Sequence, residues 1–77
     1  MELKRRVRIA VSGLGCGGAG ASTIELELAA TEGVLAVSVN PATETAYIDY
    51  DAAETDPWTL AWAIERAGYR PGRPVEA

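Results

Sequence analysis

The chain has 77 residues, of which 48% are hydrophobic and 23% are charged, and its formal net charge is −4. This length fits a single domain over residues 1–77, and the apolar fraction predicts a folded chain. The acidic balance argues against nucleic acid as a partner, because phosphate binding needs clustered lysine and arginine. The chain has no histidine, the usual general base, so we expect a binding protein rather than an enzyme.

The only cysteine is Cys16, so an internal disulfide is impossible and nothing indicates an oxidising compartment. The apolar runs are too short to span a membrane, and the first residues lack the apolar core of a signal peptide. A cytoplasmic location is therefore expected. The basic residues Lys4, Arg5, Arg6 and Arg8 are interpreted as a solvated strand end rather than a binding site.

The first expected element is a strand over residues 6–12, because apolar and polar residues alternate there. A glycine-rich turn follows, and then a helix that starts near Ala21 or Ser22, with Ser22 or Thr23 as its cap. The buried stripe of this helix comprises Ala21, Ile24, Leu28 and Thr31. Gly33 is placed to end the helix in a left-handed conformation.

Two further strands are expected over residues 34–39 and 44–50, joined by a turn at Asn40-Pro41-Ala42-Thr43. A connection this short predicts an antiparallel hairpin. Leu35, Val37 and Val39 are expected to share one face of the first strand. On the second strand, Ala46, Ile48 and Tyr50 are expected on one side.

An acidic loop over residues 51–56 leads into a second helix, which Asp56 caps and Pro57 opens. The loop lacks an EF-hand spacing, so we interpret it as solvated. The buried stripe of the helix comprises Leu60, Ala63, Ile64 and Ala67, and Gly68 ends it. Tyr69 and Arg70 begin a short fourth strand, which the following prolines confine to a sheet edge, and residues 71–77 are expected to be a frayed tail.

The order of these elements is β-α-β-β-α-β. It predicts an α+β fold of the ferredoxin-like type, in which two helices cover one face of a four-stranded antiparallel sheet.

The stretch from Val11 to Thr23 contains five of the eight glycines and Cys16, between the first strand and the first helix. Its Gly13-Leu14-Gly15-Cys16-Gly17-Gly18 run matches the G-x-G-x-x-G pattern of nucleotide sites. However, a dinucleotide fold needs several parallel strands and a longer chain, and the expected acid after the second strand is Asn40. A catalytic thiol would need a base that the chain lacks. Two interpretations remain, namely a soft-metal ligand and an ordinary thiol.

Residues 7–69, about four fifths of the chain, resemble the heavy-metal-associated domain of copper chaperones and of metal-transporting P-type ATPases. The segments that carry this resemblance are Ser12–Cys16, Ile24-Glu25 with Leu28, Glu32–Val34, Val37–Asn40, Ala42–Ala46, Tyr50-Asp51, Leu60, Ala63–Glu65 and Ala67–Tyr69. The resemblance implies the ferredoxin-like fold, binding of Cu(I) or another soft metal ion, and a role in metal trafficking.

The metal site departs from the Cys-x-x-Cys pattern of that family. Cys16 matches the first cysteine when residues are counted from the strand, and Ala19 then takes the second position. When residues are counted back from Ile24, the two positions fall on Gly17 and Gly20. The site loop, which comprises Gly13, Leu14, Gly15, Gly17, Gly18 and Ala19 around Cys16, thus holds one cysteine. By resemblance, Tyr69 packs beside this loop.

A degenerate site leaves two hypotheses for function. In the first, Cys16 binds a soft metal ion that is shared with a second copy of the chain, with a metal-transporting ATPase or with a small thiol. In the second, the domain has lost metal binding and serves as a protein-interaction or regulatory domain. Trp58 and Trp62 lie four residues apart on one face of the second helix and are the candidate interface.

Overall fold

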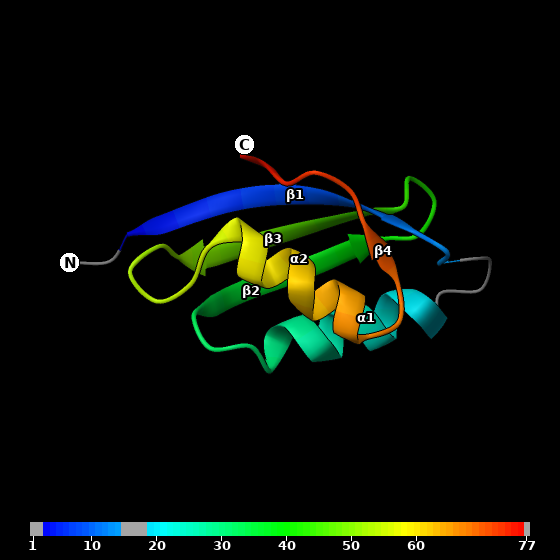
Figure 1. Ribbon diagram of the computed structural model, residues 1–77, viewed down its shortest axis with the longest axis horizontal. Helices are drawn as coiled ribbons and strands as arrows, with labels where there is room; N and C mark the ends of the chain where they lie inside the picture. The colour runs from blue at the N-terminus through cyan, green and yellow to red at the C-terminus, as the bar shows by residue number, and fades with distance from the viewer. Residues whose placement is uncertain (1–2, 15–18, 77) are drawn as a thin grey trace.

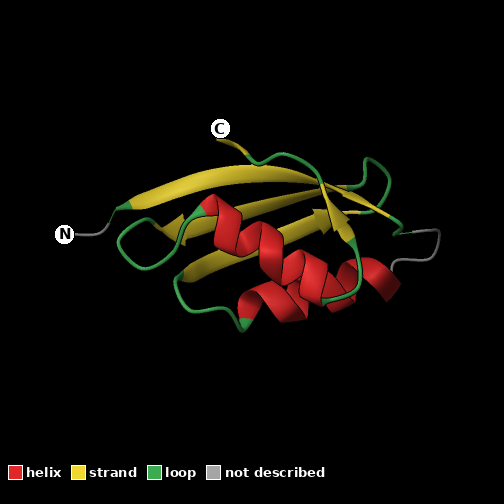
Figure 2. Ribbon diagram, viewed as in Figure 1, coloured by secondary structure: helices red, strands yellow, loops and turns green. Residues whose placement is uncertain are grey.

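Two helices cover one side of an antiparallel sheet in the computed structural model, which describes residues 3–14 and 19–76 (Figure 2). The elements in chain order are β1 (Lys4–Ser12), α1 (Ala19–Ala29), β2 (Val34–Asn40), β3 (Thr45–Asp51), α2 (Pro57–Arg66), β4 (Arg70–Pro71) and β5 (Val75–Glu76), as labelled in Figure 1. This arrangement confirms the predicted ferredoxin-like fold.

The strands follow the order β2-β3-β1-β4, and all pairs are antiparallel. The long central strand β1 pairs with β3 from Lys4↔Asp51 to Ala10↔Thr45, and its last two residues pair with β4. The predicted hairpin is confirmed, because β2 pairs with β3 from Val34↔Tyr50 to Asn40↔Thr45. Because β1 is central, the loop after its end is anchored to a strand with neighbours on both sides.

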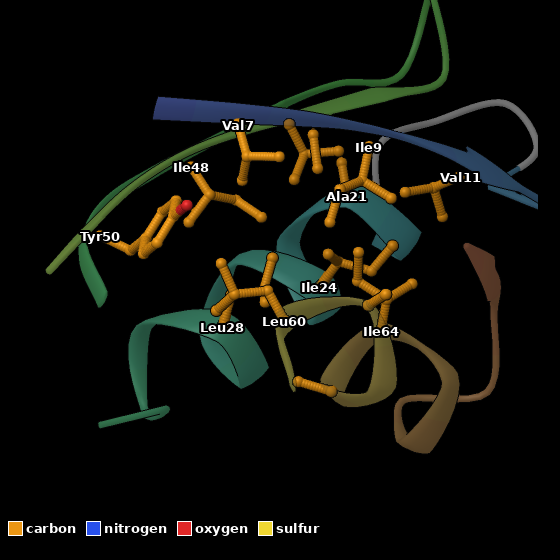
Figure 3. Packing of buried hydrophobic residues seen from close by; sticks show 14 of the residues in the cluster. Val7, Ile9, Val11, Ala21, Ile24, Leu28, Ile48, Tyr50, Leu60 and Ile64 are labelled. Carbon is orange, nitrogen blue, oxygen red and sulfur yellow. The ribbon is translucent and has the colours of Figure 1, made fainter. Parts of the chain in front are cut away.

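The core lies between the sheet and the two helices (Figure 3). Val7 and Ile9 of β1 are fully buried, as the alternation of apolar and charged residues predicts. Ile24 and Leu28 from α1 and Leu60 and Ile64 from α2 are also fully buried, and they meet the β1 and β3 side chains from the other side. The helical spacing of three and four residues therefore places one apolar stripe of each helix on the sheet.

The pattern of faces on β2 differs from the prediction, in which Leu35 shares a face with Val37 and Val39. Leu35 is 47% exposed, whereas Val34 packs against the core. The reason is a bulge, since Val34 pairs with Tyr50 and Ala36 pairs with the next residue, Asp49. The extra residue shifts the alternation at the start of the strand. Farther along this edge strand, the Glu25 carboxylate of α1 accepts a hydrogen bond from the Val39 amide at 2.9 Å.

Helix α2 begins and ends as its sequence predicts. Asp56 is the N-cap, and its carboxylate accepts a hydrogen bond from the Thr59 amide at 2.9 Å. Helix α1 differs, because it begins at Ala19, so Ser22 and Thr23 lie within the helix and not at its cap. The helix was expected to start near Ala21 or Ser22, but it also includes Gly20, although glycine disfavours helices.

The end of the chain also differs from the expected frayed tail. After β4, the Gly72 amide donates to the Ala10 carbonyl at 2.6 Å, and Val75–Glu76 form β5, which pairs with Val7 and Arg8. The prolines interrupt the strand without ending the pairing, because β1 still offers hydrogen-bonding groups along this edge. The tail thus covers the edge of β1 beyond β4.

Candidate functional site

The loop between β1 and α1 is held by packing before and after residues 15–18, which the structure does not describe. Gly13 follows β1 with a φ of +92°, a left-handed conformation that favours glycine. Leu14 is buried in the core, and Gly20 is buried in the first turn of α1. Cys16, together with Gly15, Gly17 and Gly18, lies outside the described residues, so the site is described by what surrounds it.

Tyr69 lies against both ends of this loop. Its Cδ1 atom is 3.9 Å from the position that a β-carbon on Gly13 would occupy, and its Oη atom is 2.9 Å from the equivalent position on Gly20. Gly68, with a φ of +97°, turns the chain out of α2 and brings Tyr69 to this end of the sheet. The aromatic ring therefore reaches from the start of the loop to the first turn of α1.

Gly20 has no free space for a side chain. A β-carbon there would lie 3.1 Å from the Leu14 carbonyl oxygen and 2.9 Å from the Tyr69 hydroxyl. A ligand side chain at this position would require the Tyr69 ring to shift. The sequence does not reveal this packing role of Gly20, because Tyr69 is 49 residues away in the chain.

A shallow pocket of about 280 Å³ opens beside the loop. Its walls are Ser12, Gly13, Gly68, Tyr69 and Arg70. Ser12 and Arg70 face each other in the β1–β4 pair, so the pocket lies where the two short strand ends meet. The sequence alone does not reveal Ser12 and Arg70 as neighbours, because only the pairing of β4 with β1 brings them together.

Within residues 3–14 and 19–76, the structure shows no cluster of three or more histidine, cysteine, aspartate or glutamate side chains that would hold a metal ion. Soft ions such as Cu(I) prefer thiolate ligands. Cys16 carries the only thiol in the chain. Cys16 is therefore the one residue of this chain that can supply a thiolate.

The predicted interface residues lie on α2. Trp58 is 67% exposed and Trp62 is 57% exposed. The Arg66 guanidinium lies 4.9 Å from the centre of the Trp62 ring, and it also reaches Glu27 of α1 at 3.6 Å. The first turn of α2 lies at the end of that helix away from the start of α1 (Figure 1). Trp58, in that first turn, therefore lies away from the end of the fold at which α1 begins.

The basic start of β1 is partly neutralised across the sheet. Arg6 donates to both carboxylate oxygens of Asp49, at 2.7 and 3.3 Å, and Lys4 lies 3.9 Å from the same group. The hydrogen bond from Arg6 holds the pKa of the Asp49 carboxyl below its usual value. The cross-strand register positions this group, which spacing along the chain does not reveal.

None of the described helices is long and apolar enough to cross a membrane.

Known proteins share both the sequence pattern and the fold. The family model for the heavy-metal-associated domain matches residues 8–70. The chain is 39% identical over 69 residues to a copper-exporting P-type ATPase of Bacillus subtilis (strain 168). This match covers 90% of the chain but 8% of the ATPase, so the chain spans a small part of that relative.

Two solved structures show how closely the fold agrees. One is the Cu(I)-loaded N-terminal domain of a potential copper-translocating P-type ATPase from Bacillus subtilis, with a TM-score of 0.87 and 30% identity over 96% of this chain and 91% of that one. The other is a copper-binding domain from a P-type ATPase, with a TM-score of 0.88 and 25% identity over 94% and 96%. Since the family model covers most of the chain, the protein belongs to the heavy-metal-associated domain family.

Proposed function

We propose that this protein is a Cu(I)-type metal-binding or metal-trafficking module that works through the single thiolate of Cys16. The observation that carries the proposal is the family match over residues 8–70, which includes the only thiol of the chain. The relatives are described as copper-exporting, and one of them as Cu(I)-loaded. The module holds and passes on an ion and does not itself catalyse a reaction.

A single cysteine limits the chain to one thiolate ligand for a metal ion. Cu(I) is held well by two thiolates, so one chain alone provides an incomplete ligand set. We propose that the second thiolate comes from outside, either from Cys16 of a second copy or from a metal-transporting ATPase that exchanges the ion. A metal ion held this way is exposed to its partner, as transfer requires. Exchange with such an ATPase would take place in the cytoplasm.

The packing around the loop supports a site whose second thiolate comes from outside the chain. Tyr69 and Gly20 are in contact range at the start of α1, and a second ligand at residue 20 would displace the ring. The alternative second position is Ala19, whose methyl group cannot bind a metal. The chain thus has no internal substitute for the missing cysteine.

The test is an anaerobic Cu(I) titration of the reduced protein against a competing chelator, with the mass read under native conditions. The Cys16→Ala variant is the control. One ion per two chains that is lost in the control supports a shared site, and one ion per chain with a bound small thiol supports an external ligand. If the wild type binds no more Cu(I) than Cys16→Ala, the metal-binding proposal is wrong.

The exposure of the two tryptophans favours a second candidate function, a protein-interaction or regulatory domain without metal. Tryptophans that are 67% and 57% exposed are unusual on a free surface and common at interface centres. The experiment is size analysis and tryptophan fluorescence across protein concentration, with the Trp58→Gln/Trp62→Gln variant as control. A blue shift with a doubled mass, absent in the variant, supports it, and a monomer with unchanged emission at all concentrations contradicts self-association through this face.

A further inference from the structure

Strand β2 lies at one edge of the sheet. Among the described strands it has a neighbour on one side only, so its other side presents main-chain N–H and C=O groups. The strand, Val34–Asn40, contains no charged residue and no proline, and three of its seven residues are valines. Uncharged segments with high β-propensity add readily to another strand. An edge of this composition therefore favours pairing with a second chain unless something blocks it.

The two edges of the sheet are protected in different ways. Proline, which cannot donate a hydrogen bond to an added strand, interrupts the opposite edge at Pro71 in β4 and at Pro74 before β5. Strand β2 begins with the bulge between Val34 and Ala36 instead, which disturbs the regular spacing of its main-chain groups. The regular part of this edge is therefore residues 36–40.

Helix α1, which packs against β2 (Figure 1), reaches this regular part through Glu25. The Glu25 carboxylate accepts a hydrogen bond from the Val39 amide at 2.9 Å in a partly buried position, so this amide points away from β3. Main-chain groups alternate in direction along a strand, and the Val37 amide therefore points the same way. An added strand would use Val37 and Val39, and Glu25 already occupies one of them.

The charge of Glu25 adds to this block. A charged acceptor forms a stronger hydrogen bond than a neutral one. A strand added here would either displace the carboxylate or cover it, and a covered carboxylate without a partner is strongly unfavourable. The next acidic residue of the helix, Glu27, lies 3.6 Å from Arg66 of α2. The two glutamates of α1 therefore have different contacts, with Glu25 at the strand edge and Glu27 at the second helix.

We propose that Glu25 closes the β2 edge to strand addition, and that the partner it excludes is β2 of a second copy of this chain. Without Glu25, two β2 strands pair antiparallel about a two-fold axis, with Val37 of one copy opposite Val39 of the other. Both residues present outward groups, so each such pair exchanges two main-chain hydrogen bonds. A second copy fits because neither edge then buries a charge. This surface is independent of the metal-binding proposal.

The first experiment compares the masses of matched variants by sedimentation velocity. All of them carry Cys16→Ala, so neither a shared metal ion nor a disulfide links two chains. Glu25→Ala opens the edge, and Glu27→Ala removes the same charge from the residue that pairs with Arg66. We expect Glu25→Ala to form dimers as the concentration rises into the millimolar range, and Glu27→Ala to match the Cys16→Ala parent. Equal masses for all three proteins, or equal association of both glutamate variants, would overturn the proposal.

Amide hydrogen exchange, measured by NMR, locates the surface. In dilute Glu25→Ala, the Val39 amide should exchange on the order of tenfold faster than in the parent, because its acceptor is gone. At high concentration, the Val37 and Val39 amides should both become protected as the strands pair. If Glu25→Ala does not fold, Glu25→Gln takes its place, and its weaker neutral acceptor should also give faster exchange. Parent-like exchange at Val39 in a folded variant, or protection confined to α2, would contradict the proposal.

A second substitution separates edge pairing from partial unfolding. Leu35 is 47% exposed on β2, and a lysine there adds a charge that opposes strand addition. We expect Glu25→Ala/Leu35→Lys to return to the mass of the parent. In the Glu25→Ala background, Trp58→Gln/Trp62→Gln should leave the dimer intact. A dimer that survives the lysine, or one that the tryptophan substitutions abolish, would assign the association to another surface and refute the role of β2.

Discussion

At the scale of single residues, Asp49 shows how the sheet register organises charge. The hydrogen bond from Arg6 lowers the pKa of the Asp49 carboxyl, so the folded state favours its charged form. The stabilisation that this interaction gives the folded state is fully present above the pKa of an aspartate in the unfolded chain, about 4. It is lost as the pH falls through the lower pKa of Asp49 in the folded state. This ion pair therefore contributes to acid sensitivity.

We expect Asp49→Asn to lower the melting temperature by a few degrees at pH 7, as for a well-formed ion pair near the surface. The difference from wild type should shrink as the pH falls from 5 to 2.5, because the wild-type carboxyl becomes protonated. Circular dichroism melts over this range provide the measurement. Arg73→Gln, a charge change away from this pair, serves as the control. A constant difference across the pH range would show that Asp49 acts through packing and not through charge.

Tyr50 should make the folded state less stable at high pH, whereas Asp49 affects its stability at low pH. Its side chain is almost fully buried, and its hydroxyl lies 3.3 Å from the Glu76 carboxylate. Burial, and then the negative charge of Glu76, raise the pKa of the Tyr50 hydroxyl. Because the unfolded chain ionises more readily, stability should fall as the pH rises through about 10.

We expect Tyr50→Phe to remove part of this alkaline loss while changing stability at pH 7 by less than about 1 kcal/mol. Urea unfolding at pH 7 and at pH 10.5 measures both effects. Tyr47→Phe, on an exposed tyrosine of the same strand, is the matched control and should leave the alkaline loss unchanged. If Tyr50→Phe loses as much stability between the two pH values as wild type does, the ionisation of Tyr50 is not responsible.

At the scale of the elements, two glycines end the helices in similar conformations but in different surroundings. Gly33 after α1 and Gly68 after α2 have φ values of +92° and +97°. A β-carbon on Gly33 would lie 2.9 Å from the Thr55 side chain, whereas a β-carbon on Gly68 would meet nothing within 4 Å. Alanine variants at these two positions therefore separate the free-energy cost of the left-handed conformation from that of a steric clash.

We expect Gly68→Ala to lower the free energy of unfolding by about 1 kcal/mol, because alanine is strained in the left-handed conformation. Gly33→Ala should cost more, roughly 2–4 kcal/mol, since Thr55 must also move. Chemical denaturation of both variants measures the difference. Equal losses would mean that the loop around Thr55 adapts without cost.

The elements also show what sequence reasoning can reach. Helix α2 was predicted closely because its signals are local, with Asp56 as the cap, Pro57 at the first position and Gly68 at the end. The start of α1 was misplaced because Gly20 disfavours a helix, and the packing of Tyr69 and Leu14 around it is a tertiary effect. Leu35 was assigned to the face of Val37 and Val39 because nothing in the local pattern reveals the bulge.

At the scale of the whole molecule, the order of elements and the alternation on β1 were enough to predict the layers, since few arrangements bury these stripes together. The surroundings of the site were harder to predict. Ser12 and Arg70 belong to a common pocket only because β4 returns to the end of β1, and that pairing spans 58 residues. The resemblance predicted that Tyr69 packs beside the loop, and its ring lies near Gly13 and Gly20. The role of Cys16 stays a prediction.

Metal binding should also be visible in the stability of the whole domain. A ligand that binds only the folded state stabilises it by about 2.7 kcal/mol when its free concentration is 100 times Kd. For a domain of 77 residues, this corresponds to a rise in melting temperature on the order of 10 °C. We expect such a rise with chelator-buffered Cu(I) under anaerobic conditions, measured by circular dichroism.

The concentration dependence of that rise distinguishes the source of the second thiolate. If two chains share one ion, the melting temperature increases with protein concentration, because the folded species is a dimer held by the metal. If a small thiol completes the site, the rise depends on the concentration of that thiol and not on that of the protein. Cys16→Ala should show neither dependence, and an equal rise in this variant would mean that Cu(I) binds elsewhere on the chain.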